Sequence, residues 1–351
     1  MMQEIKSQKL LAVLAGILLL SLSVNEALAQ HGGYAGASSR IGYSARGMAM
    51  SNAMAAVTSQ GSYAYYNPAQ SALFSESRQA DLTVGALQYD RVFQSTGAQF
   101  QLPPSAGISF HILRTGVTDI DGRTQSGYPT QMFDASEYQL ASSFGIRLSE
   151  KMSGGIGVKF NLANYHPDLE NTTSFGLDLG LLYQSDRNIN VAFTVKDMLA
   201  SYTWNSQDLY QLDQARNVVN NFPTRLVWGL AWQPQAFTIS ADFEVQVQES
   251  ETTTQEYFVE NGTPNLQTRS KNITTSTSKL RLGGMWNAHE RFTLRAGWQL
   301  PDLDDSASWG LSSGFSVHLP FDMLSPSIDY AFVLEPYQIS NMHVFSLRLN
   351  L

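Results

Sequence analysis

Most of this chain consists of short segments in which bulky apolar residues occupy every second position. In the segment 175–183, for example, Phe175, Leu177 and Leu179 alternate with small or polar residues. Successive side chains of a β-strand point to opposite faces of a sheet, so this period predicts strands with two unlike faces. Fourteen segments follow the pattern: 80–86, 92–102, 106–112, 138–148, 155–162, 175–183, 189–196, 226–232, 237–247, 280–286, 292–300, 309–319, 328–332 and 345–351.

The connections between these segments alternate between short and long. The short ones are 103–105, 149–153, 185–188, 233–236, 287–290 and 320–326. Three connections between them are far longer: Thr115–Ala135, Asp197–Phe222 and Gln248–Ser278. Outer-membrane barrels have an even number of antiparallel strands, with short turns at one end and longer loops outside. The chain is therefore expected to form a 14-stranded antiparallel transmembrane β-barrel, in which the Thr-rich and Ser-rich loop Gln248–Ser278 is external and mobile.

Composition helps to separate a membrane barrel from a soluble β-sandwich or a lipid-carrier barrel, the alternative folds for this pattern. Charged residues make up 15% of the chain, against about 25% in ordinary soluble domains. The less apolar face of the strands carries mostly Gly, Ala, Ser, Thr and Asn, with isolated charges at Lys159, Asp178, Arg281, Arg295 and Arg348. We expect this face to line a narrow lumen and the apolar face to contact lipid.

Two further features bound the location and the partners. Residues 1–29 combine Lys6 and Lys9, an apolar core and the small-residue triplet Ala27-Leu28-Ala29, which is typical of a secretory signal peptide cleaved after Ala29. A retained membrane anchor is the alternative, although the apolar run is shorter than the roughly 20 residues that a spanning helix needs. A net charge of −8 argues against nucleic acid as a partner, and the lack of cysteine excludes disulfides and thiolate metal sites.

The segment 30–78, which precedes the barrel residues 79–351, shows no alternation and is rich in Gly, Ala, Ser and Met. It is expected to plug the lumen, because glycines allow an irregular backbone to pack closely against the wall. Arg46 is expected to pair with a lumen carboxylate such as Asp178 or Asp242. Whether the plug binds a ligand or is only structural is left open by the sequence.

Several residues of this plug-like segment are candidates for a ligand or lumen site. Met48, Met50 and Met54, with Tyr63, Tyr65, Tyr66 and Phe74, could line a hydrophobic conduit or simply pack against one another. A helix over 47–57 would place Met50 and Met54 on one face. Asn67 and Pro68 form a turn signal just before the strands begin.

No catalytic residue, metal site or cofactor is expected. The sequence from Gly310 to Gly314 matches the G-x-S-x-G motif of serine hydrolases, but it lies in an alternating segment and not at a strand-to-helix elbow. His166 and Asp168 fall in a loop without an implied serine partner. Acidic clusters such as Asp302, Asp304 and Asp305 lack the ligand spacing of a calcium loop.

The N-terminal segment also resembles a known family. The runs Ala45-Arg46-Gly47-Met48-Ala49-Met50 and Tyr66-Asn67-Pro68-Ala69 are similar to the N-terminal signature of the PorV/PorQ family, within the FadL-like superfamily of outer-membrane proteins. Later runs that resemble the family's strands are Pro223-Thr224-Arg225-Leu226, Leu282-Gly283-Gly284-Met285-Trp286, Leu294-Arg295-Ala296-Gly297-Trp298 and Asp329-Tyr330-Ala331-Phe332. Ser51 and Asn52 stand where the family usually carries a pair of glycines.

The resemblance implies an outer-membrane barrel without enzymatic activity, with lipid and envelope proteins as partners. PorV-like and PorQ-like members serve the type IX secretion system, so a role in protein secretion is the first interpretation, with partner contacts in the three long loops. The alternative is a FadL-like channel that takes up long-chain fatty acids or other hydrophobic small molecules. That alternative implies a hydrophobic ligand in the lumen and an opening in the barrel wall.

Overall fold

The structure, a computed structural model, describes residues 35–59, 64–73, 78–124, 126–205, 218–260, 263–319, 325–338 and 340–350. The expected signal peptide, together with Tyr63 and Phe74, lies outside the described residues. No helix among the described residues is long and apolar enough to cross a membrane.

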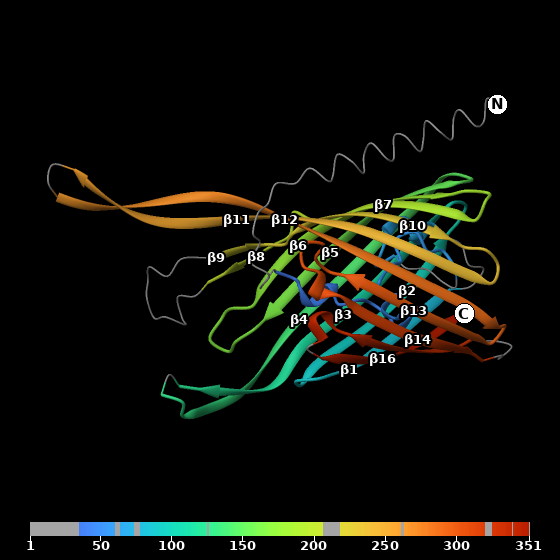
Figure 1. Cartoon of the computed structure of the whole chain (residues 1–351), viewed down its shortest axis with the longest axis horizontal. Coiled ribbons are helices and arrows are strands. Elements are labelled where there is room, and N and C mark those ends of the chain that lie inside the picture. Colours follow the sequence, from blue (N-terminus) through green and yellow to red (C-terminus); the bar gives the residue numbers. More distant parts are fainter. Residues whose placement is uncertain are drawn as a thin grey trace.

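Fourteen of the described strands form one closed antiparallel barrel, as the alternation predicted (Figure 1). They are β1 (Gln79–Leu87), β2 (Arg91–Leu102), β3 (Ala106–Arg123), β4 (Pro129–Ser149), β5 (Met152–Asn164), β6 (Thr172–Gln184), β7 (Ile189–Met198), β10 (Thr224–Trp232), β11 (Phe237–Glu260), β12 (Thr263–His289), β13 (Phe292–Leu300), β14 (Gly310–His318), β15 (Ser327–Leu334) and β16 (Asn341–Asn350). Pairing of β1 with β16 closes the barrel, so neither strand leaves an unpaired edge.

The predicted short turns 103–105, 149–153, 185–188, 233–236 and 287–290 lie at one end of the barrel, but two of the three predicted long loops are wrong. Strands β3 and β4 continue to Arg123 and Pro129, and β11 and β12 pair from Phe237 and Trp286 out to Glu260 and Thr263. The latter pair forms a twisted ribbon that projects far beyond the barrel (Figure 1). Antiparallel backbone pairing and the high strand propensity of Thr outweigh the missing apolar alternation, which is needed only where one face is buried or in lipid.

The third long connection, Asp197–Phe222, holds a separate two-stranded sheet of β8 (Ser201–Trp204) and β9 (Val218–Asn221). Its residues 206–217 lie outside the described part of the chain. Phe222 closes the base of this hairpin, since its N–H donates to the Ala200 carbonyl at 2.9 Å.

The two faces of the barrel wall match the predicted assignment. Outward side chains are apolar and exposed, whereas inward neighbours are buried: Leu82 is 54% exposed and Thr83 only 1%. The exposed apolar side chains come from strands around the barrel and include Leu82, Val84, Phe110, Ile112, Leu140, Phe144, Ile156, Phe160, Phe175, Leu179, Leu181, Leu230, Trp232, Ile239, Leu282, Trp286, Leu294, Leu311, Phe315, Ile328, Phe345 and Leu347.

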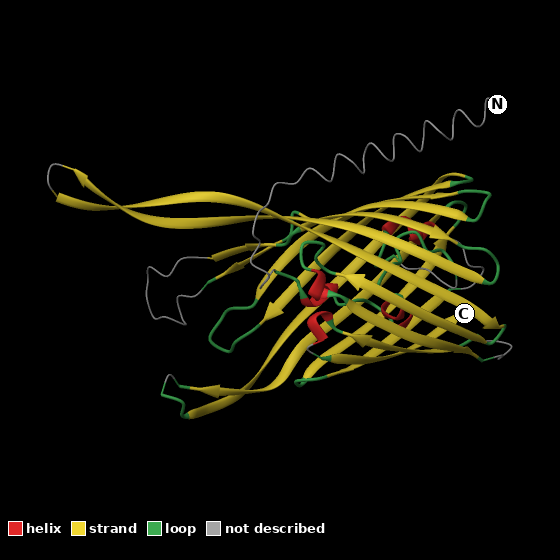
Figure 2. Cartoon of the chain, in the orientation of Figure 1, coloured by secondary structure: helices red, strands yellow, loops and turns green. Residues whose placement is uncertain are grey.

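The described residues of the N-terminal segment, 35–59 and 64–73, lie in the lumen against the wall, and Figure 2 shows short helices inside the outline of the barrel. It contains the short helices η1 (Ser38–Arg40), α2 (Ala45–Ala49) and η2 (Pro68–Ala72). Two further short helices, η3 (Ser306–Ser308) and η4 (Pro336–Gln338), lie in connections between strands. We call residues 35–59 and 64–73 the plug.

Inward glycines of the wall make room for the plug. A Cβ atom added at Gly107, Gly155 or Gly297 would lie within 3.0 Å of plug atoms, mostly of the backbone. A Cβ atom added at Gly145 or Gly180 would also come within 3.0 Å of a plug atom. The Gly-rich inner face is therefore a surface shaped to a second segment of the same chain.

The condition under which Met50 and Met54 would share a helical face, a helix over 47–57, is not met, because α2 ends at Ala49. Ser51 and Asn52 follow with φ angles of 51° and 61°, in the left-handed region that L-residues occupy at a cost of roughly 1–2 kcal/mol each. The PorV/PorQ family, which the N-terminal motifs resemble, usually has glycine at these two positions. Glycine adopts left-handed φ angles without steric cost, which explains a Gly pair there.

Candidate functional site

Arg46 holds α2 to the barrel wall. Its guanidinium is 2% exposed and donates from Nε to the Asp329 carboxylate at 3.0 Å, and from a terminal nitrogen to Ser327 Oγ at 2.7 Å. The expected partners Asp178 and Asp242 are wrong, since the path of the plug places α2 against β13 to β16. Asp178 instead pairs with Lys159 at 2.7 Å, and Asp242 accepts the Ala55 N–H at 3.0 Å.

The three plug methionines do not form one continuous line. Met50 and Met54 belong to a buried cluster with Tyr65 and Tyr66, but Met48 lies in a second cluster with Phe93 and other residues. Met48 also borders a cavity described below. The structure thus brings Met50 and Met54 together and sets Met48 apart.

Tyr65 and Tyr66 form the aromatic centre of the plug. Their rings meet edge to face with centroids 4.9 Å apart, and the Tyr43 ring stacks on Tyr65 with centroids 5.4 Å apart. Lys196 lies over the Tyr65 ring at 4.9 Å and donates to the Tyr65 carbonyl at 2.6 Å. The Tyr66 hydroxyl donates to Asn52 Oδ1 at 2.7 Å, which links the two parts of the plug.

Asn67 and Pro68 begin η2, as the turn signal indicated. Asn67 Oδ1 accepts the Ala69 N–H at 3.0 Å and caps the helix. Its amide nitrogen donates to the carbonyls of Ala55 and Leu181, at 3.1 and 3.2 Å. Asn67 therefore ties η2 both to the rest of the plug and to the wall.

An irregularity in the wall places a charge cluster in the lumen. The β6–β7 register shifts between Leu177 and Leu179, so that Lys196 and Asp197 are both buried although they are consecutive. Asp197 accepts from Lys159 at 2.7 Å and from Arg225 at 2.6 Å. Sequence alternation alone could not reveal this cluster, because an extra residue in one strand breaks the period on which it relies.

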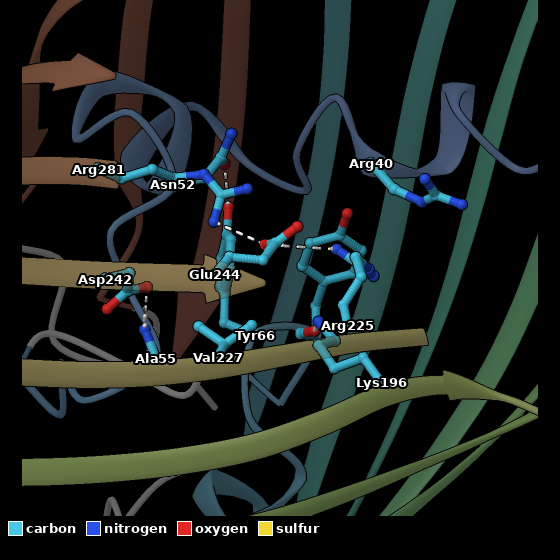
Figure 3. A pocket seen from close by; sticks show the side chains of 11 residues that line it. Arg40, Asn52, Ala55, Tyr66, Lys196, Arg225, Val227, Asp242, Glu244 and Arg281 are labelled. Atoms are coloured by element: carbon cyan, nitrogen blue, oxygen red, sulfur yellow. Dashed lines mark hydrogen bonds and ion pairs between the residues drawn. The ribbon is translucent and has the colours of Figure 1, made fainter. Parts of the chain in front are cut away.

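A second group of charges lies beside the first and is visible in Figure 3. Glu244 accepts from Arg281 at 2.8 Å and lies 4.0 Å from Arg225. These charged residues line a small pocket, and Figure 3 also shows Arg40 of the plug on its far side. Burial and the nearby Arg225 lower the pKa of Arg40 to about 10, and Asp197 opposes that shift, so Arg40 stays positively charged at neutral pH.

Two cavities are relevant to a ligand, and the first of them borders the plug. One of about 230 Å³ lies toward the projecting ribbons and combines the apolar side chains of Ile41, Met48, Pro301, Val333, Pro336 and Met342 with the cations Arg40, Lys279 and Arg281 and the carboxylates Glu244 and Glu335. Among the described residues, Arg40 Nε has no hydrogen-bond partner. The other cavity, of about 410 Å³, lies at the short-turn end and is lined by residues such as Asn287, Thr293 and His318.

The G-x-S-x-G motif lies inside β14, as the alternation predicted. Ser312 Oγ donates to the Ala49 carbonyl at 3.0 Å and lies 2.8 Å from Ser51 Oγ, so this serine holds the plug in place. The described residues contain no group of three or more His, Cys, Asp or Glu side chains arranged to hold a metal ion.

Comparison with solved structures identifies the fold. The chain is similar to the CymD monoaromatic hydrocarbon channel, with 15% identity, a TM-score of 0.57 and coverage of 88% of this chain and 97% of that chain. A Pseudomonas aeruginosa FadL homologue is similar at 13% identity and TM-score 0.58, over 88% and 98% of the two chains. The Pseudomonas putida toluene transporter TodX gives 15% identity and TM-score 0.54, over 88% and 97%.

The chain has a FadL-like barrel fold. No protein-family model and no curated protein matches the sequence. At these identities the similarity concerns the fold alone, and it does not test the resemblance of the N-terminal motifs to the PorV/PorQ subfamily.

Proposed function

We propose that this protein is an outer-membrane channel for hydrophobic small molecules that carry an anionic end group. The observation that carries the proposal is the cavity of about 230 Å³ beside the plug, which is lined by apolar side chains and by Arg40 and Lys279. The carboxylates of Glu244 and Glu335 also line it, but each pairs with an arginine, Arg281 and Arg91, at 2.8 Å. The proposal departs from the first interpretation of the sequence, a secretion role, and favours its alternative.

The location follows from the two faces of the wall. A closed barrel satisfies its backbone hydrogen bonds internally, and an outward apolar band removes the cost of contact with hydrocarbon. Exposed residues such as Leu179, Phe144 and Phe345 supply that band. The expected signal peptide at residues 1–29 agrees with export to the outer membrane.

The chemistry of the cavity selects the ligand class. Met48, Val333 and Met342 offer an adaptable apolar surface. Arg40 and Lys279 offer charged donors. Arg40 Nε makes no hydrogen bond among the described residues, and its nearest carboxylate oxygen, on Asp197, is 3.9 Å away. A volume of about 230 Å³ lies below the roughly 300–1,000 Å³ of typical ligand pockets, so the cavity would hold the anionic head and the first part of an apolar chain.

Equilibrium binding tests this assignment. We expect the protein in lipid nanodiscs to bind dodecanesulfonate more tightly than 1-dodecanol, with empty nanodiscs subtracted. The Lys279→Gln variant should weaken dodecanesulfonate binding about tenfold, since a charge-assisted hydrogen bond contributes about 1.5–3 kcal/mol, and should leave dodecanol binding unchanged.

Lys151→Gln is the matched control, because Lys151 lies in an exposed turn at the opposite end of the barrel. It should bind both molecules like the wild type. Absence of wild-type binding to either molecule, or equal losses in the two variants, would contradict the proposal.

Protein secretion is the second candidate, favoured by one observation. Strands β11 and β12, of 24 and 27 residues, extend well past the barrel as a ribbon that could contact another protein (Figure 1). Replacing residues 250–273 by an Asn-Gly turn would shorten this ribbon where Glu249 pairs with Thr274. Loss of a co-purifying envelope protein on this change would support a role in secretion. An unchanged set of co-purifying proteins would contradict that role.

A further inference from the structure

We infer that a small pocket between the plug and strands β7, β10, β11 and β12 binds one monovalent inorganic anion, such as chloride. The pocket lies beside the cavity of about 230 Å³ and is distinct from it, and the inference does not depend on the proposed channel function. Six charged side chains line the pocket: Arg40, Lys196, Arg225, Asp242, Glu244 and Arg281 (Figure 3).

The charges around this pocket do not balance. Its lining holds four cations and two carboxylates. Their ion-pair partners outside the lining are one cation and two carboxylates, Lys159, Asp178 and Asp197. The whole group therefore has five cations and four carboxylates, a formal charge of +1. Lys279, which lines the larger cavity, adds further positive charge nearby.

Lys196 lacks an anionic partner. It is 4% exposed, and its Nζ donates to the Tyr65 carbonyl at 2.6 Å and lies 4.9 Å from the centre of the Tyr65 ring. Among the described residues it forms no ion pair with a carboxylate. An ammonium has three donors, and burying a charge without a paired partner is costly. A bound anion would supply that partner.

Arg40 brings a second incompletely bonded donor from the plug. Its side chain is 10% exposed, and a terminal nitrogen donates to the Ala35 carbonyl at 2.6 Å. Its Nε has no hydrogen-bond partner among the described residues. The distance from Nε to the Asp197 carboxylate is 3.9 Å, which is too long for a hydrogen bond. The pocket thus has two buried cations, from different parts of the chain, with donors available to an anion.

The arrangement of the charges defines where the anion binds. In the view of Figure 3, Arg40, Lys196 and Arg225 lie on one side of Glu244, and Asp242 lies on the other. An anion beside the three cations would therefore lie away from Asp242. It would join the plug, through Arg40, to strands β7 and β10 of the wall.

The size of the pocket selects the kind of anion. Its volume is about 30 Å³, which exceeds the roughly 10–15 Å³ that one water molecule needs. This space suits a monatomic ion such as chloride and leaves no room for the apolar chain of an amphiphile. A water molecule would fit as well, but it would leave the positive charge uncompensated.

The larger cavity gives the anion a route to the pocket. Arg40, Asn52, Glu244 and Arg281 line both spaces, so the two are neighbours. An anion from the medium on the ribbon side would reach the pocket through the larger cavity. Arg40 can contact an anion in the pocket and a ligand in the larger cavity, because a guanidinium carries five N–H donors.

Unfolding in two salts tests the inference without any measurement of transport. The unfolded chain has no such pocket, so a bound anion stabilises the folded protein. Sodium chloride is titrated against sodium gluconate, whose six-carbon anion is too large for the pocket, at a constant ionic strength of about 0.15 M. The urea concentration at the unfolding midpoint, for protein in vesicles of zwitterionic lipid, should rise with chloride and reach a plateau.

Lys196→Gln removes the charge and keeps most of the side chain, and should weaken the apparent chloride affinity at least tenfold. Lys151→Gln, in the exposed turn at the short-turn end, is the control and should keep the wild-type chloride dependence. Equal midpoints in the two salts for the wild type, or an unchanged chloride dependence in Lys196→Gln, would overturn the inference.

Two further measurements keep the test decisive if Lys196→Gln does not fold. Arg40→Gln, which changes only the plug, should also weaken the chloride affinity at least tenfold. Bromide scatters X-rays anomalously, so crystals of the wild-type protein grown in bromide should show an anomalous peak in contact with Lys196 Nζ. A pocket without that peak, or an Arg40→Gln variant with wild-type chloride affinity, would overturn the inference.

Discussion

The outward and inward faces of the same strands place different constraints on their residues. On β6, Leu179 points outward and is 43% exposed, and any apolar side chain of similar size could replace it. Its neighbours Asp178 and Gly180 point inward; Asp178 bonds Lys159, and Gly180 makes room for Asn67. The surrounding lipid therefore requires only that outward side chains be apolar. Each inward side chain must instead fit particular atoms of the plug and the wall.

The largest expected effect tests the inward face. Arg46→Ala would leave the Asp329 carboxylate buried without its ion-pair partner, and should lower the free energy of unfolding by about 3–5 kcal/mol. Urea unfolding of the protein in lipid vesicles measures this change. Arg123→Ala, which removes a solvent-exposed pair with Asp121, should cost no more than about 1 kcal/mol. Similar losses in the two variants would contradict the account.

A charge on the outward face comes next. Leu179→Arg near the middle of β6 should destabilise the barrel by about 2–4 kcal/mol, because the guanidinium would face hydrocarbon. Leu148→Arg, close to the short-turn end of β4, should cost only about 0–1 kcal/mol. The same unfolding assay compares the two, and a larger cost at Leu148 would show that the apolar band is misplaced.

A single methyl group gives the smallest effect. Gly155→Ala would place a Cβ within 3.0 Å of the backbone of Pro68 and Ala69, and should cost about 1–3 kcal/mol of unfolding free energy. Gly284→Ala adds the same group on the outward face, where the nearest atom is 3.9 Å away. Its effect should stay within about 0.5 kcal/mol. Equal stability of the two variants would contradict the claim that the plug fits tightly against the wall.

The difference between the faces also explains what the sequence could predict. Outward residues such as Leu82 and Phe175 have one requirement, so alternation was enough to assign the fourteen strands and their orientation. The partner of Arg46 depends on the path of the plug through the lumen, and inward carboxylates at 178, 242 and 329 all met the requirement for charge. Only the fold distinguishes Asp329 from the other two.

Two other features escaped prediction for related reasons. The charge cluster around Asp197 depends on a register shift in β7. No characteristic residue type marks such a shift in the sequence. The ribbon of β11 and β12 consists of polar strands outside the barrel, where neither face needs to be apolar. In both places pairing between strands, and not the pattern within one strand, decides the structure.

Flux of an anionic amphiphile across a membrane tests the central claim most directly. Dodecanesulfonate suits this measurement, because its charged head group crosses a lipid bilayer only at a high energetic cost. Proteoliposomes should take up radiolabelled dodecanesulfonate faster than protein-free liposomes and should exclude glucose, since the plug closes the lumen to polar solutes. Uptake no faster than in protein-free liposomes, or equal entry of glucose, would contradict the claim that this barrel is a channel for hydrophobic molecules with an anionic end.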